Sequence, residues 1–288
     1  MKLLITGAGT LLGNNLAKKA KLKEFDVIAT YRNSYPKNLK REKIRILKLD
    51  LEKEFNINFN VDCLVHCASA IPSDNLDHNT TMKVNFIGFK RLVKQSLKNG
   101  CKKIILISTM SVYGDIKKGK VTEKTKLHPI NSYGKSKLKM EKFLQDISKK
   151  NKISFYILRL PGLIGFKSDF NYISKTLKNI KNKKLVEFSN PNLKFNNMVH
   201  VENLTDIIIK ICRLKGSKIL NIASKNPIML KNIIALMFKF EKKEKNINIL
   251  QSKKKGFSIE ISNYLRKNFK LFSVKNSLSL FLKENQNK

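Results

Sequence analysis

The feature that most constrains this fold is the alternation of short apolar runs with helical patterns over the first two thirds of the chain. Runs rich in β-branched residues predict strands at "KLLITG", "FDVIATY", "IRILKLD", "CLVHCAS", "KKIILIST" and "SFYILRLPG". Helical spacing of apolar residues falls between them, as in "LLGNNLAKKAKL" and "TMKVNFIGFKRLVKQSLK". This order predicts an α/β fold, a Rossmann-type doubly wound parallel sheet, because right-handed crossovers place helices on both faces.

The alternation loosens after Gly162, which predicts a second, smaller lobe in a chain of 288 residues. We expect residues 1–165 to form the larger domain, whose first strand and helix carry the glycine-rich stretch "ITGAGTLLGNNL" that is typical of a dinucleotide-binding domain. Residues 196–223 would return to that domain, because they again read as strand and helix. Residues 166–195, which look helical and lysine-rich, and the mostly helical residues 224–288 would form a small C-terminal lobe that binds the substrate.

The charge balance is unusual, with 59 basic against 21 acidic residues and a net charge of +38. The lysines are spread from end to end, with no basic arm and no basic cluster interleaved with aromatic residues. Abundant Lys, Asn and Ile without Trp is typical of an AT-rich genome, so we do not expect nucleic acid as a partner. A general positive field would still attract an anionic substrate or cofactor.

The sequence favours a cytoplasmic protein. No apolar run approaches the ~18 residues of a membrane span, and the apolar start "MKLLITGAG" is too short for a signal peptide. Cys63 and Cys67 flank His66, but no second ligand pair follows at zinc-like spacing. We therefore expect no metal, and reduced, buried thiols at Cys63, Cys67, Cys101 and Cys212.

The stretch "ITGAGTLLGNNL" follows the first predicted strand and opens the first helix, which is the context of a dinucleotide loop. Glycine permits a tight turn there, and the N-terminus of the helix offers free N–H groups to a pyrophosphate. The pattern is imperfect, since Leu12 and Thr10 stand where the two common glycine spacings need glycine. The predicted loop comprises Gly7, Gly9, Thr10, Leu11, Leu12 and Gly13.

The end of the second predicted strand indicates which dinucleotide would bind. An NAD site usually has an acidic residue here that binds the adenosine ribose hydroxyls. This chain has Thr30 and Tyr31, followed by Arg32. A guanidinium suits a 2′-phosphate, and no carboxylate repels it. We therefore expect NADP, with NAD as the alternative.

Eight short motifs, in order, resemble the extended short-chain dehydrogenase/reductases of the nucleotide-sugar epimerase/dehydratase group. They are "TGAGTLLG", "LDL", "HCASA" (for His-x-Ala-Ala), "VN" at Val84–Asn85, "ISTMSVYG", "YGKSK", "LRLPGLIG" and "NNMVHVENL". The resemblance covers nearly the whole chain and implies a Rossmann fold and a nucleotide-sugar substrate. It also implies further cofactor contacts at Asp50, Leu51, Cys67, Ala68, Ser69, Asn85, Tyr133, Lys137 and Pro161.

Tyr133 and Lys137 are four residues apart in a helical pattern, so they share one face of the helix. A nearby ammonium would lower the pKa of the phenol from about 10 and make it a useful acid or base. The resemblance implies that Lys137 also holds the nicotinamide ribose. It further implies that the Thr109 hydroxyl binds the substrate oxygen while Tyr133 transfers the proton and the nicotinamide exchanges a hydride.

Departures from the family patterns exclude some of the reactions that the family catalyses. Met110 and Ser111 occupy the places of the Asp-Glu pair of sugar dehydratases, so dehydration is not expected. Ser111 and Lys167 stand where reductase–epimerases of the GDP-fucose synthase type have cysteine and histidine, which argues against double epimerisation.

The hypothesis is therefore an NADPH-dependent reductase of a nucleotide-linked keto sugar. One alternative is a 4-epimerase with tightly bound NAD(P), and another is a non-catalytic family member that binds nucleotide or RNA. The resemblance also allows a homodimer through the helices that carry Asn85 and Tyr133.

Overall fold

The computed structural model describes residues 1–74, 76–116, 119–252 and 256–286. The chain divides into two compact units, each assembled from separate segments. Unit 1 contains residues 1–114, 127–159 and 205–220, and unit 2 contains residues 115–126, 160–204 and 221–288. Relative to the predicted limits, residues 160–165, 196–204 and 221–223 belong to unit 2, together with the segment 115–126.

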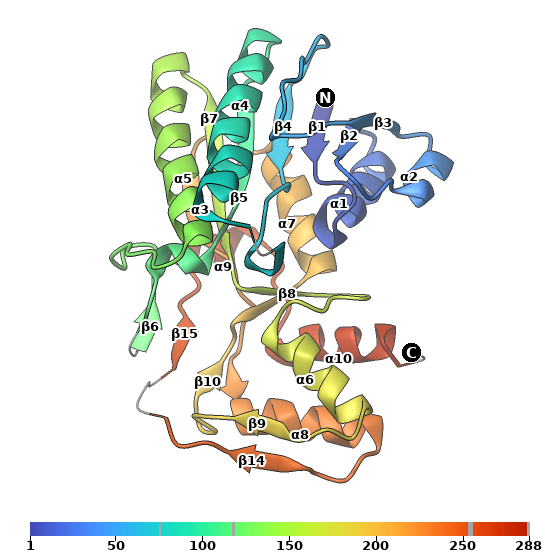
Figure 1. Cartoon of the computed structure of the whole chain (residues 1–288), viewed down its shortest axis with the longest axis vertical. Helices are drawn as coiled ribbons and strands as arrows, with labels where there is room; N and C mark the ends of the chain where they lie inside the picture. Colours follow the sequence, from blue (N-terminus) through green and yellow to red (C-terminus); the bar gives the residue numbers. More distant parts are fainter. Residues whose placement is uncertain (75, 117–118, 253–255, 287–288) are drawn as a thin grey trace. The chain divides into compact units, whose positions relative to one another are not determined.

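Unit 1 is built on a seven-stranded sheet of the predicted parallel, doubly wound type (Figure 1). Its order is β12-β7-β5-β4-β1-β2-β3. The strands are β1 (Lys2–Thr6), β2 (Asp26–Tyr31), β3 (Arg45–Lys48), β4 (Cys63–His66), β5 (Lys103–Thr109), β7 (Ser154–Leu160) and β12 (Lys218–Asn221). In the parallel register Thr6 lies beside Thr30 of β2 and His66 of β4. The carboxyl ends of these strands therefore meet at one edge, where parallel α/β sheets bind their ligands.

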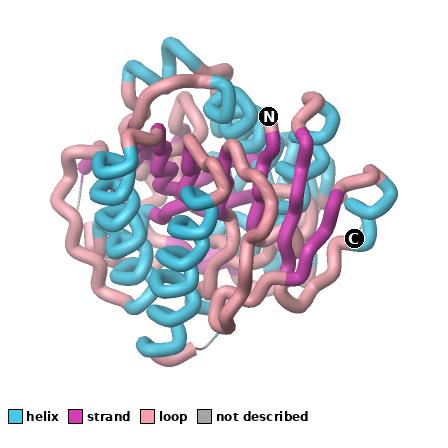
Figure 2. The backbone as a smooth tube through the Cα atoms, turned by 90° about the horizontal axis from the view of Figure 1, so that it is seen from above, coloured by secondary structure: helices cyan, strands magenta, loops and turns pink. Residues whose placement is uncertain are grey.

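Helices cover both faces of this sheet, as the tube view also shows (Figure 2). They are α1 (Leu11–Leu22), α2 (Lys37–Arg41), α3 (His78–Met82), the π-helix η2 (Lys83–Ile87), α4 (Gly88–Lys98), α5 (Ser132–Asn151) and α7 (Val201–Arg213), with short 3₁₀ helices η1 (Pro72–Asp74) and η3 (Met110–Tyr113). One core joins the strands to α4 and α5 through buried Phe89, Leu92, Met140 and Leu144. On α1 and α7, Lys19 Nζ lies 2.5 Å from Asp206 Oδ1.

A lysine on β5 caps the C-terminus of α7. Lys103 Nζ donates to the carbonyl oxygens of Ile211 at 3.0 Å and Cys212 at 2.6 Å, and also to that of Leu214. These are the last carbonyls of a helix, which have no intrahelical partner and carry the negative end of its dipole. A contact across more than one hundred residues of sequence thus fixes α7 to the sheet.

The described residues of unit 2 form short strand pairs and four helices around their own core. The pairs are β6 (Gly119–Val121) with β15 (Phe257–Ile259), β8 (Gly162–Ile164) with β11 (Met198–His200), β9 (Val186–Phe188) with β14 (Ile247–Ile249), and β10 (Lys194–Phe195) with β13 (Ile228–Met229). The helices are α6 (Tyr172–Lys181), α8 (Leu230–Glu241), α9 (Asn263–Asn268) and α10 (Val274–Glu284). The prediction of a mainly helical lobe missed β9, β10, β13, β14 and β15, because strands of two or three residues show no periodicity. The strand expected at the start of residues 196–223 is β11.

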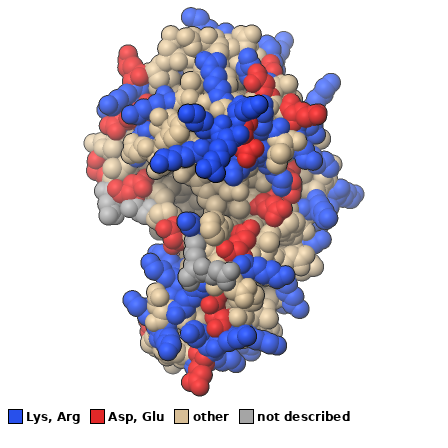
Figure 3. All heavy atoms as spheres, turned by 90° about the vertical axis from the view of Figure 1, so that its right-hand side faces the viewer, with Lys and Arg blue, Asp and Glu red and all other residues tan. Residues whose placement is uncertain are grey.

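None of the helices among the described residues is long and apolar enough to cross a membrane. Lys and Arg side chains are scattered over the face drawn in Figure 3, with Asp and Glu among them. All four cysteines are free; Cys63, Cys101 and Cys212 are buried as predicted, whereas Cys67 is half-buried.

Candidate active site

The glycine turn between β1 and α1 is as tight as the sequence predicts. Gly7 has a φ of +78°, and a Cβ on Gly13 would lie 2.2 Å from the Gly7 carbonyl oxygen. Thr10 is the N-cap of α1: its Oγ1 donates to Gly7 O at 2.8 Å and accepts from Gly13 N at 3.3 Å. The amides of Leu11 and Leu12 precede the first possible intrahelical bond, so they are oriented to bind an anion.

The ends of the next two strands carry the predicted adenosine contacts. Arg32 directly follows β2 and is exposed, whereas Thr30 is buried and its carbonyl accepts from Ala8 N at 2.7 Å. Asp50 follows β3 and is half-buried, with Oδ1 accepting from Glu52 N at 3.0 Å. Leu51 is buried. No carboxylate stands on the last residues of β2 beside Arg32.

The segment after β4 is fastened to β1 by one threonine. Thr6 Oγ1 bonds His66 Nδ1 at 2.9 Å and accepts from Ala68 N at 3.2 Å. His66 is fully buried, and its Nε2 has no hydrogen-bond partner in the described residues. Burial holds the pKa of its imidazole well below the usual range, and the charge of Lys137 lowers this pKa further. Burial also raises the pKa of the Cys67 thiol to about 12, so this thiol is not a nucleophile.

Asn85 joins this segment to helix α5. It lies on the π-helix η2 and is fully buried. Its Oδ1 accepts from Ala70 N at 2.7 Å, and its Nδ2 donates to Ala70 O and to Ser136 Oγ, each at 3.0 Å. A π-helical turn is rare and is frequently found at functional sites.

The structure brings Tyr133, Lys137 and Thr109 together. Asn131 caps α5 with a 2.8 Å bond from Gly134 N, which places Tyr133 in the first turn and Lys137 one turn later. Lys137 Nζ donates to Ile107 O on β5 at 2.9 Å and lies 5.8 Å from the centre of the Tyr133 ring. Thr109 ends β5, and hydrogen bonding from Thr109 and Ser69 favours the ionised form of Tyr133.

The expected lowering of the Tyr133 pKa is wrong for this structure. Burial raises the pKa of Tyr133 to about 12 and outweighs the hydrogen bonds from Thr109 and Ser69. Burial also lowers the pKa of Lys137 to about 8, against the opposing influence of Cys67 and Glu141. The apolar surroundings therefore favour the neutral form of both groups, and at neutral pH Tyr133 retains its proton.

The sequence did not identify a buried ion pair one turn beyond Lys137. Glu141 is fully buried, with Oε2 lying 2.6 Å from Arg159 Nη2 and Oε1 accepting from the Ser108 hydroxyl. Arg159 Nη1 also donates to Tyr113 Oη at 2.8 Å. The signal was present in "YGKSKLKME", where an acid lies on the same helix face as Tyr133 and Lys137. This pair fixes α5 to β7 beneath the site.

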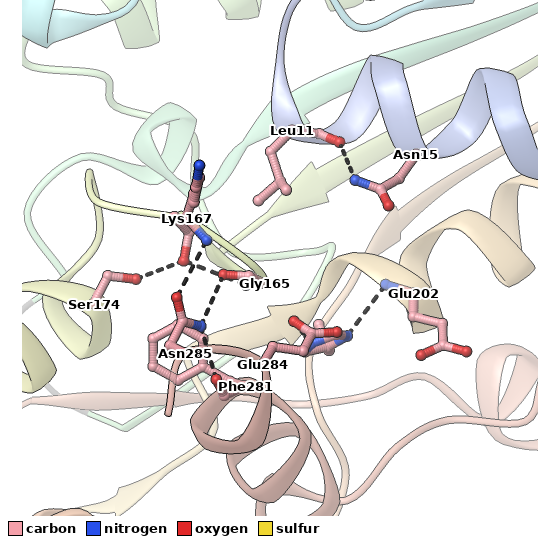
Figure 4. A network of polar contacts seen from close by, with 11 residues as sticks. Leu11, Asn15, Gly165, Lys167, Ser174, Glu202, Phe281, Glu284 and Asn285 are labelled. Atoms are coloured by element: carbon pink, nitrogen blue, oxygen red, sulfur yellow. Dashed lines mark hydrogen bonds and ion pairs between the residues drawn. The ribbon is translucent and has the colours of Figure 1, made fainter. Parts of the chain in front are cut away.

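Two residues singled out in the sequence belong to unit 2, so they are described with that unit. Pro161 lies between β7 and β8. Lys167 has a φ of +62° and lies in a loop held by Asn285, the residue that follows α10. Asn285 Oδ1 accepts a hydrogen bond from Lys167 N at 3.2 Å (Figure 4).

Unit 2 also gathers His200, Glu202 and Glu284, whose potential metal-ligand atoms lie within 4.8 Å of one another. Both ring nitrogens of His200 are engaged in protein contacts: Nδ1 accepts from Glu202 N, and Nε2 bonds Glu284 Oε2, each at 3.2 Å (Figure 4). Burial lowers the pKa of His200 to about 4, so a neutral imidazole joins β11 to α10. The sequence did not identify this cluster.

Comparisons with known proteins point to one family. Residues 3–223 match the model of the NAD dependent epimerase/dehydratase family. The chain is 27% identical over 188 residues to dTDP-4-dehydrorhamnose reductase of Aggregatibacter actinomycetemcomitans, covering 64% of this chain and 59% of that protein. It is 27% identical over 166 residues to UDP-glucose 4-epimerase 3 of Oryza sativa subsp. japonica, covering 50% and 44%. The chain thus spans about half the length of the curated relatives it matches.

The fold has close counterparts among solved structures. UDP-glucuronic acid 4-epimerase from Bacillus cereus in complex with NAD matches with a TM-score of 0.82 and 20% identity, over 99% of this chain and 96% of that chain.

Proposed function

The chain belongs to the NAD-dependent epimerase/dehydratase family, and on that premise we propose that it reduces a nucleotide-linked keto sugar with a nicotinamide dinucleotide as hydride donor. The observation that carries the proposal is the meeting of Tyr133, Lys137 and Thr109 at the carboxyl end of β5. The same unit carries the glycine turn of β1 at the same edge of the sheet.

The residues of unit 1 fit a dinucleotide. The amides of Leu11 and Leu12 at the N-terminus of α1 would hold the pyrophosphate, and Lys137 would hold the nicotinamide ribose. As the family resemblance implies, Asp50 and Leu51 would border the adenine. The segment Cys67–Ser69 would border the nicotinamide side. Bound there, the cofactor supplies the hydride.

The protein's own residues supply the proton and hold the substrate oxygen. The Thr109 hydroxyl would donate a hydrogen bond to the carbonyl oxygen, and Tyr133 would give that oxygen its proton as the carbonyl carbon receives the hydride. The product is an alcohol, and the phenolate regains its proton from solvent. Burial favours the neutral phenol, which suits proton donation, and the Lys137 ammonium lies 5.8 Å from the ring centre, where it stabilises the anion that remains.

Arg32 supports NADP as the cofactor. It is exposed at the end of β2, where its guanidinium would reach a 2′-phosphate without a neighbouring carboxylate. Reductive biosynthesis draws on NADPH, which agrees with a reductase.

One further reaction is disfavoured and one remains as a second candidate. Met110 and Ser111 follow Thr109, so no carboxylate stands there to eliminate water, and dehydration is disfavoured. A 4-epimerase is the second candidate, because 4-epimerases are among the curated relatives. An epimerase would return its hydride to the same sugar and would retain the dinucleotide through purification, whereas a reductase would release it.

The test is dinucleotide oxidation by the purified protein with nucleotide-linked 4-keto sugars, compared with the Tyr133→Phe variant. We expect the variant to lower turnover by about 10²-fold or more with dinucleotide affinity nearly unchanged, because only the proton donor is lost. Tyr156→Phe is the matched control, since it removes a phenol of unit 1 whose Oη donates a hydrogen bond to Lys215 O at 3.1 Å, and it should turn over as wild type. Normal turnover by Tyr133→Phe would refute the proton-transfer role, and dinucleotide retained at one equivalent with interconversion of sugar epimers would favour the epimerase.

A further inference from the structure

A buried hydroxyl in the second turn of α5 holds the backbone of Tyr133. Ser136 is fully buried, and its Oγ donates to the Tyr133 carbonyl oxygen at 2.8 Å. In an α-helix the same carbonyl accepts from the amide of the residue four positions on, which here is Lys137. One carbonyl thus joins the backbone of Tyr133 to both Ser136 and Lys137.

The direction of the Ser136 bond is fixed by its neighbour on η2. Asn85 Nδ2 donates to Ser136 Oγ at 3.0 Å, so this oxygen accepts there and has its single proton left for the Tyr133 carbonyl. The Asn85 amide cannot be reversed, because its Oδ1 accepts from Ala70 N at 2.7 Å and its Nδ2 donates to Ala70 O at 3.0 Å. These four bonds therefore admit one arrangement of protons.

The bonds form a chain between two parts of unit 1 that are distant in sequence. The chain begins at Ala70 in the segment after β4, passes through Asn85 and Ser136, and ends at the Tyr133 carbonyl. Asn85 and Ser136 are fully buried, so solvent does not compete for their bonds. A buried polar network whose members are all satisfied is rigid, so it holds the backbones of Ala70 and Tyr133 in a fixed relation.

Tyr133 needs such a contact because it lies where a helix is least constrained. It is the second residue of α5, in the turn whose N–H groups have no intrahelical acceptor. Gly134 follows it, and glycine has the greatest backbone freedom of any residue. The capping bond from Gly134 N to Asn131 Oδ1 at 2.8 Å holds the glycine. The bond from Ser136 acts on the Tyr133 carbonyl itself.

We propose that Ser136 is a positioning residue which, held by Asn85, fixes the backbone of Tyr133 relative to the segment after β4, so that the phenol meets the substrate oxygen at proton-transfer distance. Ser136 exchanges no proton with the substrate and acts only through Tyr133. Its effect on turnover rests on the proposed function, whereas its hold on the Tyr133 backbone exists without any substrate.

The first experiment compares turnover by Ser136→Ala and Ser136→Thr with that of wild type. Alanine is the best helix former, so Ser136→Ala removes the bond and keeps α5. We expect its kcat for dinucleotide oxidation to fall about 10-fold, because a displaced phenol slows proton transfer. Dinucleotide affinity and substrate KM should stay unchanged, and the solvent deuterium isotope effect on kcat should rise, which a general loss of structure would not produce. Ser136→Thr, which retains the hydroxyl, should restore the wild-type kcat.

Amide hydrogen exchange measures the same contact without substrate. The Lys137 amide, which bonds to the Tyr133 carbonyl, should exchange about 10-fold faster in Ser136→Ala, from the loss of one buried hydrogen bond. Amides in the last turn of α5 should exchange as in wild type. Ser136→Cys repeats both measurements with little change in volume, and it should shift them in the same direction because a thiol is only a weak donor.

Ser148→Ala is the matched control. Ser148 is a buried serine of the same helix, and its Oγ also donates to the carbonyl three residues earlier, that of Gln145, at 2.9 Å. The substitution removes the same local bond at the other end of α5, so it should leave kcat and the exchange of the Lys137 amide unchanged.

An unchanged kcat in folded Ser136→Ala or Ser136→Cys, with an active wild type, would overturn the positioning role, as would an equal fall in kcat for Ser148→Ala. Unchanged exchange of the Lys137 amide would overturn the hold of Ser136 on the Tyr133 backbone. Faster exchange in a protein whose wild type oxidises no dinucleotide would uphold that hold and count against the proposed function alone.

Discussion

At the residue scale, the environment of Tyr133 is set by burial more than by charge. The Tyr-x-x-x-Lys spacing correctly predicted that Tyr133 and Lys137 share one helix face, because this depends only on the 3.6-residue period of the helix. The spacing could not reveal that both groups lie in an apolar interior, where the pKa of each moves toward its neutral form. It also could not reveal the role of Glu141, which depends on its ion pair with Arg159 of another element.

A substitution of Arg32 tests, at the residue scale, whether the protein prefers NADP to NAD. Arg32→Asp should shift the ratio of NADP to NAD affinity toward NAD by about 10-fold or more, because a carboxylate repels a 2′-phosphate and accepts from a ribose hydroxyl. Dinucleotide binding measured by titration calorimetry gives the ratio.

Arg41→Asp is the matched control, since it makes the same charge change at another exposed position of unit 1. An equal change in both variants would mean that Arg32 acts only through general charge.

At the element scale, the unusual segment is the helix that turns from α-helical through π-helical to α-helical geometry at η2 and α4. Gly88 begins α4 at the point where this helix touches the backbone after β3. A Cβ there would lie 2.5 Å from the Leu51 carbonyl oxygen and 2.7 Å from Leu51 Cβ. The sequence shows only a glycine in a helical pattern, which indicates a locally less stable helix and gives no sign of a close backbone contact.

Gly88→Ala separates these two interpretations. Helix propensity alone predicts that alanine stabilises the protein by up to about 1 kcal/mol. The close backbone contact instead predicts a loss of about 1–3 kcal/mol in the free energy of unfolding, because the carbonyl cannot move aside. Urea denaturation measures the difference. Lys94→Ala, an exposed substitution on the same helix, is the control and should change stability by less than about 0.5 kcal/mol.

The elements of unit 1 were largely predictable and those of unit 2 were not. Strands such as β1 and β5 have five and seven residues, so their apolar runs stand out in the sequence. The pair β10 and β13 has two residues in each strand and joins Phe195 to Ile228. Such pairing is decided by tertiary contacts, which a local pattern does not contain.

At the scale of the whole molecule, the charge of +38 should oppose folding. We expect the thermal midpoint to rise when sodium chloride is increased from about 0.01 M to about 0.15 M, because the Debye length falls from about 30 Å to about 8 Å and screens the repulsion. Differential scanning calorimetry at fixed pH measures the midpoint.

An uncharged osmolyte at matched osmolality is the control for effects unrelated to screening. A midpoint that falls with salt would show that local ion pairs, such as Lys19 with Asp206, outweigh the net repulsion.

The bond network of Lys103 bears on how the protein forms during its synthesis. The lysine leaves the ribosome more than one hundred residues before Leu214, the last carbonyl it caps, and β12 follows later still. Until that point β7 has no neighbour on its outer side in the sheet order. The sheet of unit 1 therefore stays incomplete while most of the polypeptide is translated. A cut at residue 165 would separate Lys103 from the helix end whose carbonyls it binds.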